Sequence, residues 1–198
     1  MSSKETVLAE NNKQQKILKA ASEIIAEKGL RESTITEIAS KAGVVDSIIY
    51  HYFKNKEELL FEIMQLAGRD LFALLEDVIE KEKDPAECLK KMIRAHIVDW
   101  CLNRKKETKI IVTDYAYLTG KRKSLNFETE RKLYSLYKKK FSEMSRKGLT
   151  VDADLTVLSF SLFGIIAQSI RWYRVSGTLS KEDVADNVIR ILLHGILK

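Results

Sequence analysis

Polar and aromatic side chains that suit contacts with nucleic acid gather in one short stretch of the chain, residues 46–56. A short helix over residues 46–52 would fit the major groove of DNA, where an outward face reads the edges of the bases. The residues that we expect to face the bases are Ser47, Ile48 and His51. The residues whose hydroxyl or ammonium groups we expect to hold phosphates are Tyr50, Tyr52 and Lys56.

A second short helix has to position this face. Thr34 and Glu37 have the spacing of a capping box, in which the threonine oxygen accepts from the backbone N–H of Glu37 and the glutamate reaches back. The box predicts a helix through Ala42, after which Gly43 permits a sharp turn. Apolar contacts between the two helices would come from Ile38, Ala39, Val44, Ile49 and Phe53. The pattern therefore predicts a helix-turn-helix.

These residues also resemble the TetR/AcrR family of transcriptional regulators. The matching motifs are Thr34, Ile38-Ala39, Ala42-Gly43-Val44, Tyr50-His51-Tyr52-Phe53 and Lys56 to Leu59, within a resemblance that covers residues 13–60. The resemblance implies a domain that binds a double-stranded DNA operator. The residues that it places at the DNA are Thr34, Thr36, Val45, Asp46, Ser47, Ile48, Tyr50, His51, Tyr52 and Lys56.

The chain departs from the family pattern at the start of the second short helix. Val45 stands where the family usually has a serine that caps this helix. Asp46 follows, and it could take over the cap or accept a hydrogen bond from cytosine; we favour the cap. Ile48 replaces a small polar residue and could contact thymine methyl groups. These departures leave the operator sequence open.

The composition favours an all-α fold, because a single proline and eight glycines leave few of the residues that turns of β proteins require. Helical patterns separated by caps and glycines predict about nine helices. We expect a disordered arm over residues 1–12, a three-helix DNA-binding domain over 13–57, and a helical ligand-binding and dimerisation domain over 58–198. The helices expected in these two domains cover residues 13–29, 34–42, 46–52, 55–81, 84–102, 105–118, 124–147, 152–176 and 180–198.

The last two predicted helices are apolar on more than one face. A helix that is apolar all round must be covered twice, once by its own domain and once by another surface. We therefore predict a homodimer built on Leu158, Leu162, Ile165, Val184, Val188, Ile191 and Gly195. The uncharged run from residue 155 to 170 is too short to span a bilayer, so we expect no membrane partner.

The middle helices combine aromatic and basic residues. The net charge is +6, yet residues 1–57 hold nine Lys/Arg against eight Asp/Glu, whereas residues 100–147 hold fourteen against five. We expect a small-molecule effector to bind Trp100, Arg104, Lys105, Lys109, Tyr115, Tyr137, Phe141 and Phe163, with its phosphates near Arg104, Lys105 and Lys109. The alternative is that the aromatic residues are core and the lysines a solvated face.

A local pattern in the C-terminal half suggests the class of effector. Phe163-Gly164, Trp172-Tyr173-Arg174 and Gly177-x-Leu179-Ser180 are similar to the closing helices of a TetR subgroup that often senses acyl-CoA thioesters. An acyl-CoA is therefore our hypothesis for the effector. The alternative is that these residues are core or dimer-surface aromatics followed by a helix stop and a cap.

Catalytic and cofactor chemistry is absent from the sequence. The three histidines are scattered, with no metal-ligand spacing, and there is no phosphate loop or nucleophile elbow. The two cysteines, Cys88 and Cys101, would lie about 20 Å apart on one helix, too far for a disulfide, which fits a reducing cytoplasm.

We therefore expect a cytoplasmic, ligand-responsive repressor that is not an enzyme and has no cofactor. The alternatives are a constitutive dimeric DNA-binding protein without an effector and a helical small-molecule carrier that does not bind DNA.

Overall fold

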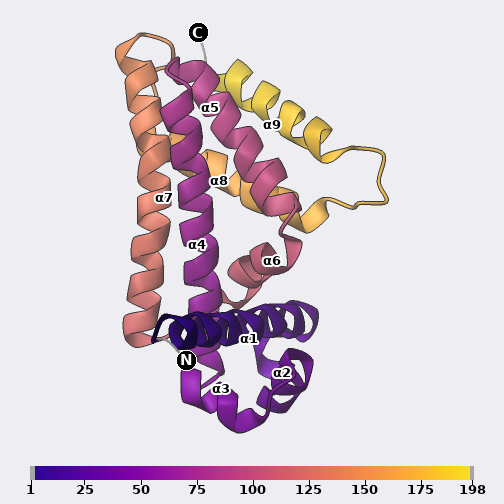
Figure 1. Ribbon diagram of the computed structural model, residues 1–198. Coiled ribbons are helices and arrows are strands. Elements are labelled where there is room, and N and C mark those ends of the chain that lie inside the picture. Colours follow the sequence, from indigo (N-terminus) through magenta and orange to yellow (C-terminus); the bar gives the residue numbers. More distant parts are fainter. Residues whose placement is uncertain (1–2, 197–198) are drawn as a thin grey trace. The chain divides into compact units, whose positions relative to one another are not determined.

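The computed structural model describes the backbone of residues 3–196 and the side chains of residues 10–193, and this part of the chain is helical without a β-strand. The predicted all-α fold is confirmed. In chain order the elements are α1 (Ser3–Glu32), α2 (Ile35–Ala42), α3 (Asp46–Tyr52), α4 (Lys56–Lys81), α5 (Pro85–Arg94), the π-helix η1 (Ala95–Leu102), α6 (Lys105–Asp114), the 3-10 helix η2 (Tyr115–Tyr117), α7 (Gly120–Arg146), α8 (Leu155–Trp172) and α9 (Lys181–Ile196) (Figure 1).

The chain divides into two compact units. Unit 1 combines the chain up to Ala67 with Lys106–Asn126, and unit 2 combines Gly68–Lys105 with Phe127–Lys198. The predicted boundary between residues 57 and 58 leaves the later segment out of the first unit. The physical reason for the difference is that Ile110 and Leu118, from this later segment, are buried in the core formed by the N-terminal helices.

The N-terminal helix begins earlier than predicted. We expected a disordered arm over residues 1–12, of which residues 1 and 2 lie outside the described part of the chain, whereas α1 already begins at Ser3. Residues 3–28 contain neither glycine nor proline and are rich in Glu, Lys, Gln and Ala, so nothing in them stops a helix. Gly29 interrupts the helix with a φ of 83°, at the position where the sequence predicted its end.

The core of unit 1 forms around α1, α2, α3 and the start of α4. Its fully buried side chains include Ile17, Ile25, Ile38, Ile49 and Phe53. The predicted turn between α2 and α3 is confirmed, because Gly43 adopts a left-handed φ of 70° and its N–H donates to the carbonyls of Ala39 and Ser40. The two short helices are therefore fixed by a glycine turn and by a shared apolar core.

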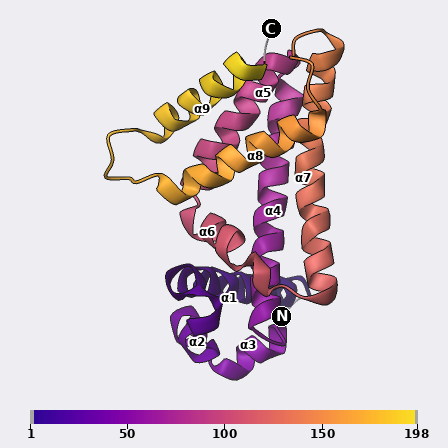
Figure 2. The same ribbon diagram turned by 180° about the vertical axis from the view of Figure 1, so that it is seen from behind.

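Unit 2 contains a wide helical turn that the sequence analysis missed. We predicted one helix from residue 84 to 102, but α5 ends at Arg94 and the chain continues as η1. Both η1 and α5 contact α9, and η1 also contacts α8 (Figure 2). Seven of the eight side chains of η1 are buried, and only Asp99 is exposed. The segment is therefore a core element of unit 2.

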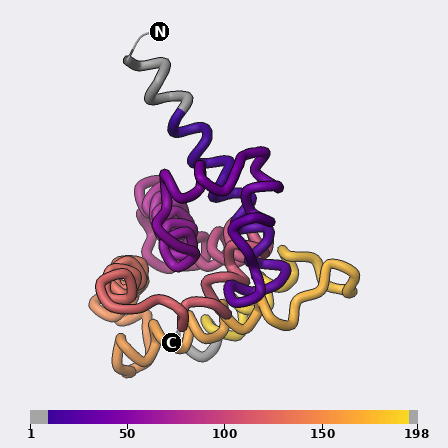
Figure 3. The backbone as a smooth tube through the Cα atoms, turned by 90° about the horizontal axis from the view of Figure 1, so that it is seen from below, coloured from indigo at the N-terminus to yellow at the C-terminus, as the bar shows by residue number. Residues whose placement is uncertain are grey.

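The ends of α8 and α9 are set by side-chain caps. We predicted Asp152 as the cap of α8, but Asp154 accepts from the backbone N–H groups of Thr156 and Val157, because the helix begins at Leu155. Ser180 caps α9 as predicted, with its Oγ accepting from the N–H of Asp183 at 3.0 Å. Figure 3 shows the loop over residues 173–180 that separates the two helices.

Candidate nucleic-acid interface and interior site

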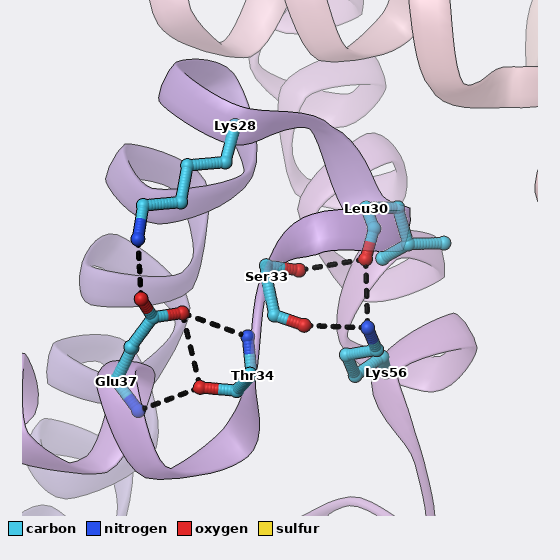
Figure 4. Close-up of polar contacts among 6 residues, drawn as sticks. All are labelled: Lys28, Leu30, Ser33, Thr34, Glu37 and Lys56. Carbon is cyan, nitrogen blue, oxygen red and sulfur yellow. Dashed lines mark hydrogen bonds and ion pairs between the residues drawn. The ribbon is translucent and has the colours of Figure 1, made fainter.

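The start of α2 is fixed by a capping box and an ion pair. The hydroxyl of Thr34 accepts from the N–H of Glu37 at 3.2 Å, and Glu37 Oε2 accepts from the N–H of Thr34 at 3.0 Å. The ammonium of Lys28 pairs with the other oxygen of Glu37 (Figure 4). The hydrogen bond from Lys28 lowers the pKa of the Glu37 carboxyl. The predicted capping box is confirmed, and the Lys28–Glu37 ion pair connects α2 to α1.

The outer face of α3 carries most of the side chains predicted to meet DNA. Val45 is 64% exposed and Tyr50 57%, and Ser47 and His51 are also exposed. Ile48 differs from the expectation, because it is partly buried and packs against the core of unit 1, as does Tyr52. The side chains of α3 that are free for base edges or phosphates are therefore Ser47, Tyr50 and His51.

Asp46 links the two short helices and does not cap α3. Val45 is the N-cap residue of this helix, and no side chain caps it. The carboxylate of Asp46 accepts instead from the hydroxyl of Thr36, with Oγ1 and Oδ2 2.7 Å apart. The favoured interpretation of Asp46 as a cap is therefore wrong, because its side chain turns toward α2.

Lys56 has a structural role that the sequence analysis did not predict. Its ammonium donates to the carbonyls of Leu30 at 2.8 Å and Ser33 at 2.5 Å (Figure 4), and to that of Arg31 at 3.1 Å. An ammonium has three donors, so these contacts use all of them. In this arrangement Lys56 ties the first residue of α4 to the last turn of α1 and has no donor left for a phosphate.

The same end of α1 is held from another side by α6. The N–H of Leu30, directly after the Gly29 kink, donates to Oδ1 of Asp114 at 2.9 Å, and Asp114 is only 4% exposed. Lys109 donates to the carbonyl of Ala26 at 2.5 Å. We call the contacts of Asp114 and Lys109 with α1 the α6 latch. Within unit 1 it connects the base of the helix-turn-helix to the helix that follows η1 in the chain.

Six aromatic rings form a continuous cluster in unit 2, which extends from the buried His96 and Tyr137 to the exposed Phe160. They come from η1, α7 and α8, and adjacent ring centroids are between 4.4 and 6.0 Å apart. The members of this ring cluster are His96, Trp100, Tyr134, Tyr137, Phe160 and Phe163. Three of them, Trp100, Tyr137 and Phe163, were predicted to bind the effector, whereas His96 was not predicted as their neighbour. The four-residue spacing between His96 and Trp100 was the available signal.

The centre of the ring cluster is uncharged. Burial lowers the pKa of His96 to about 3, and it raises the pKa of Tyr137 well above its ordinary value. Nδ1 of His96 and the hydroxyl of Tyr137 are 3.0 Å apart, and that hydroxyl donates to the carbonyl of Met92 at 3.3 Å. The histidine is therefore a neutral imidazole that is hydrogen-bonded through Nδ1 to the tyrosine hydroxyl.

The cations predicted to hold effector phosphates each make contacts within their own unit. Arg104 pairs with Asp70 at 2.5 Å, and Lys105 lies 4.8 Å from the ring centre of Tyr173 and donates to its carbonyl. Lys109 belongs to unit 1, in the α6 latch. Tyr115 also lies in unit 1 and is 42% exposed, whereas Phe141 is fully buried in unit 2. Of the predicted effector site, only Trp100, Tyr137 and Phe163 are therefore joined in the ring cluster.

Most of the residues predicted for a dimer interface belong to the core of unit 2. Leu158, Leu162, Val184 and Val188 are each at most 8% exposed, Ile165 is half-buried, and the side chain of Gly195 lies outside the described residues. Only Ile191, at 66%, faces outward. The exposed apolar residues of α8 are Val157, Phe160 and Trp172. The face available to a partner is therefore the outer side of α8 and α9, whereas most of the predicted residues lie on the buried side.

Two further features of the described residues bear on function. By length and composition alone α8 could cross a membrane, but one side of it, including Leu162 and Ile166, is buried in unit 2. Among the described residues no group of His, Cys, Asp and Glu could hold a metal ion.

Two family models match the chain. Residues 17–63 match the model described as bacterial regulatory proteins, tetR family, and residues 82–196 match the model described as tetracyclin repressor-like, C-terminal domain. The first range contains the helix-turn-helix with its exposed α3 face, and the second contains the ring cluster. The two matches together include both of the candidate sites described above.

Similar proteins are known from sequence and from solved structures. The chain is 25% identical to the HTH-type transcriptional repressor KstR2 of Mycobacterium tuberculosis over 95% of this chain and 94% of that one. It is 37% identical to the fatty acid metabolism regulator protein of Bacillus subtilis, over 42% and 43% of the two chains. The crystal structure of AibR in complex with isovaleryl coenzyme A and operator DNA superposes with a TM-score of 0.85 and 28% identity, covering 91% of this chain and 98% of that one. The chain therefore belongs to the TetR family of bacterial regulatory proteins.

Proposed function

We propose that the protein is a ligand-responsive transcriptional repressor that binds a double-stranded DNA operator as a homodimer. The observation that carries the proposal is the exposed face of α3, which presents Ser47, Tyr50 and His51 from a helix held in place by the Thr34 box and the Thr36–Asp46 bond. A short helix with such a face reads base edges in the major groove. The AibR complex with operator DNA supports this role for the fold.

The homodimer forms through the exposed apolar face of α8 and α9. Phe160 and Ile191 are 63% and 66% exposed, and Val157 and Trp172 of α8 are exposed as well. Exposed apolar side chains that gather in one patch mark sites of protein–protein contact. A two-fold dimer also gives the symmetry that a paired operator requires, with two reading helices about one turn of DNA apart. The predicted interface therefore moves from the buried side of these helices to their outer side.

The effector is an acyl-CoA thioester whose acyl chain enters unit 2 at the ring cluster. Aromatic side chains with a few polar groups are typical of ligand sites. AibR was crystallised with isovaleryl coenzyme A, and the Bacillus subtilis relative is a fatty acid metabolism regulator. The phosphates of the effector bind at Arg104 and Lys105, which exchange their present contacts with Asp70 and Tyr173 for the ligand.

The signal passes from the effector to DNA through α6. Only Asn103 and Arg104 separate η1, with two members of the ring cluster, from α6, and the last residue of α6 holds α1 through the α6 latch. A ligand that binds better to a different arrangement of η1 shifts the population toward it, by as much as its preference for that arrangement. The contacts of the α6 latch with α1 then change. As a result, α2 and α3 no longer have the arrangement that fits the operator.

This role requires no catalytic chemistry and no cofactor, so the protein acts as a regulator and not as an enzyme, in the cytoplasm. The test begins with the selection of an operator from random duplex DNA. In a mobility shift assay with that duplex we expect a sharp complex that isovaleryl-CoA dissociates and free CoA does not. Binding to DNA that no acyl-CoA alters would contradict the effector and leave a constitutive DNA-binding protein. Failure to enrich any sequence would contradict the whole proposal.

A further inference from the structure

One buried polar group of unit 2 has no hydrogen-bond partner. Nε1 of Trp100 is buried and has no acceptor among the described residues, and the whole side chain is only 5% exposed. Leaving a buried donor unpaired costs about 1–3 kcal/mol, so such groups are rare in folded proteins. The cost suggests that the donor is kept for a partner that the protein chain does not itself supply.

Trp100 lies in a segment of unit 2 with unusual backbone geometry. It belongs to η1, and π-helical turns are rare and occur frequently at functional sites. The wide turn brings the ring of Trp100 edge-on to that of His96, with centroids 5.9 Å apart and an interplanar angle of 77°. His96 in turn contacts Tyr137 and Phe163, so the unpaired donor adjoins the ring cluster.

The two tyrosine hydroxyls and Nδ1 of His96 in the ring cluster have partners. The hydroxyl of Tyr134 donates to the carbonyl of Thr156 at 2.7 Å, and the hydroxyl of Tyr137 donates to that of Met92. His96 uses Nδ1 toward Tyr137. The N–H of Trp100 is therefore the donor in this cluster that is available to a ligand.

The chemistry around the donor limits the kind of acceptor it can take. No member of the ring cluster is a cation, and burial keeps His96 neutral by holding its pKa at about 3. A carboxylate buried here would lose its hydration without gaining a countercharge, which is strongly unfavourable. A carbonyl oxygen loses far less hydration and needs only one donor.

We propose that the indole N–H of Trp100 donates a hydrogen bond to an uncharged carbonyl oxygen of the effector, so that the site selects a thioester or ketone over the matching carboxylate. The inference rests on the proposed function, because it names the group that recognises the effector proposed there. It also gives a reason for the effector to be the CoA ester and not the free acid: the ester carbonyl is neutral.

The test removes the N–H and keeps the ring. Site-specific replacement of Trp100 by β-(3-benzothienyl)alanine puts sulfur in place of the N–H with little change of shape, and Trp100→Phe is a second variant made of natural residues. Calorimetry compares isovaleryl-CoA with S-(3-methylbutyl)-CoA, a thioether that lacks the carbonyl. The benzothienyl protein should bind the thioester about threefold to tenfold more weakly and the thioether unchanged. Equal effects on both ligands, or no effect on either, would overturn the assignment.

A matched control uses the other tryptophan. The same replacement at Trp172, which is 48% exposed, should not alter the ratio of thioester to thioether affinity. Thermal unfolding of the ligand-free proteins adds an independent measurement. Loss of an unpaired donor costs nothing, so the protein with the analogue at Trp100 should melt at or above the wild-type temperature. A fall of several degrees would mean that the N–H already has an internal partner, and would refute the proposal.

A last measurement distinguishes a failure of the donor role of Trp100 from a failure of the acyl-CoA proposal. If the wild-type protein binds no CoA derivative, the acyl-CoA proposal fails, and the indole ¹H–¹⁵N resonance of Trp100 is then titrated with methyl isovalerate and with isovalerate. A shift with the ester and none with the anion upholds the donor role without CoA. A shift with neither compound, or with the anion alone, overturns it.

Discussion

Loss of the Asp114 carboxylate should both destabilise unit 1 and weaken the link between effector and DNA. Oδ1 of Asp114 accepts from the N–H of Leu30 at 2.9 Å, and the other oxygen accepts from the hydroxyl of Thr113 at 2.6 Å. Because Asp114 is only 4% exposed, Asp114→Ala leaves the N–H of Leu30 buried without an acceptor. We expect the free energy of unfolding to fall by about 2 kcal/mol.

The structure also predicts the order of a variant series. Asp114→Asn keeps an oxygen for Leu30 but loses the charge, so its loss of stability should be about half that of Asp114→Ala. For a chain of this size about 2 kcal/mol lowers the melting temperature by about 4–8 °C. Asp152→Ala is the matched control, because this aspartate is exposed and the cap of α8 is Asp154. The control should melt at the wild-type temperature.

The functional measurement is the ratio of operator affinities with and without isovaleryl-CoA. Substitution of a residue that transmits coupling between two sites changes the coupling free energy by about 0.5–2 kcal/mol. Asp114→Ala should therefore reduce this ratio by about twofold to thirtyfold, while the affinity for the effector itself changes little. A variant that melts lower but keeps the full ratio would refute the role of the α6 latch in transmission. Unchanged melting as well would refute the bond between Asp114 and Leu30.

Three further changes test other contacts. The pKa of His96 is about 3 in the folded protein and near 6.5 in the unfolded chain, so the unfolded chain takes up the proton first as the pH falls. The stability that comes from neutral His96 is therefore complete above pH 6.5. It decreases by about 1.4 kcal/mol per pH unit as the pH falls toward 3. Urea titrations between pH 7 and 4 should show that the free energy of unfolding depends less on pH for His96→Gln than for the wild type or for His51→Gln, whose ring is exposed. The same pH dependence in all three proteins would argue against the buried neutral histidine. Lys56→Met should lower the melting temperature by several degrees, since it leaves three carbonyls without their donor. It should leave the salt dependence of operator binding unchanged. A salt-dependence slope lower by about one unit would show that Lys56 does contact a phosphate. Ile191→Glu should give a folded monomer in sedimentation that no longer binds operator, whereas Leu162→Glu, at a fully buried position, should unfold unit 2; a dimeric Ile191→Glu protein would exclude this face from the interface.

Local signals predicted the N-terminal half well because its key features are set by neighbours in the sequence. Three of these features depend on residues within a few positions of one another: the Thr34–Glu37 capping box, the left-handed Gly43 and the interruption of α1 at Gly29. The helical class followed from composition in the same way. By contrast, Asp46 could not be assigned from sequence, because its partner Thr36 lies ten residues away on another helix.

Lys56 shows why a local motif was not sufficient for the site. Its position after α3 agrees with a phosphate contact, and only the approach of the end of α1 reveals that its three donors are used on carbonyls. The dimer face illustrates the same limit. Both sides of α8 are apolar, so the sequence could not tell which side the protomer buries, and the structure leaves Phe160 and not Leu162 exposed.

The sequence by itself determined the helical class, the helix-turn-helix and the family resemblance, because these depend on periodicity, caps and short motifs that act over a few residues. Only the tertiary structure decided where the later segment belongs and what fills the interior. It joined residues 106–126 to unit 1 through the burial of Ile110 and Leu118, and it placed His96, the neighbour of Trp100, against rings from α7 and α8. These contacts link residues far apart in the chain, and their geometry is fixed by packing that no local pattern encodes.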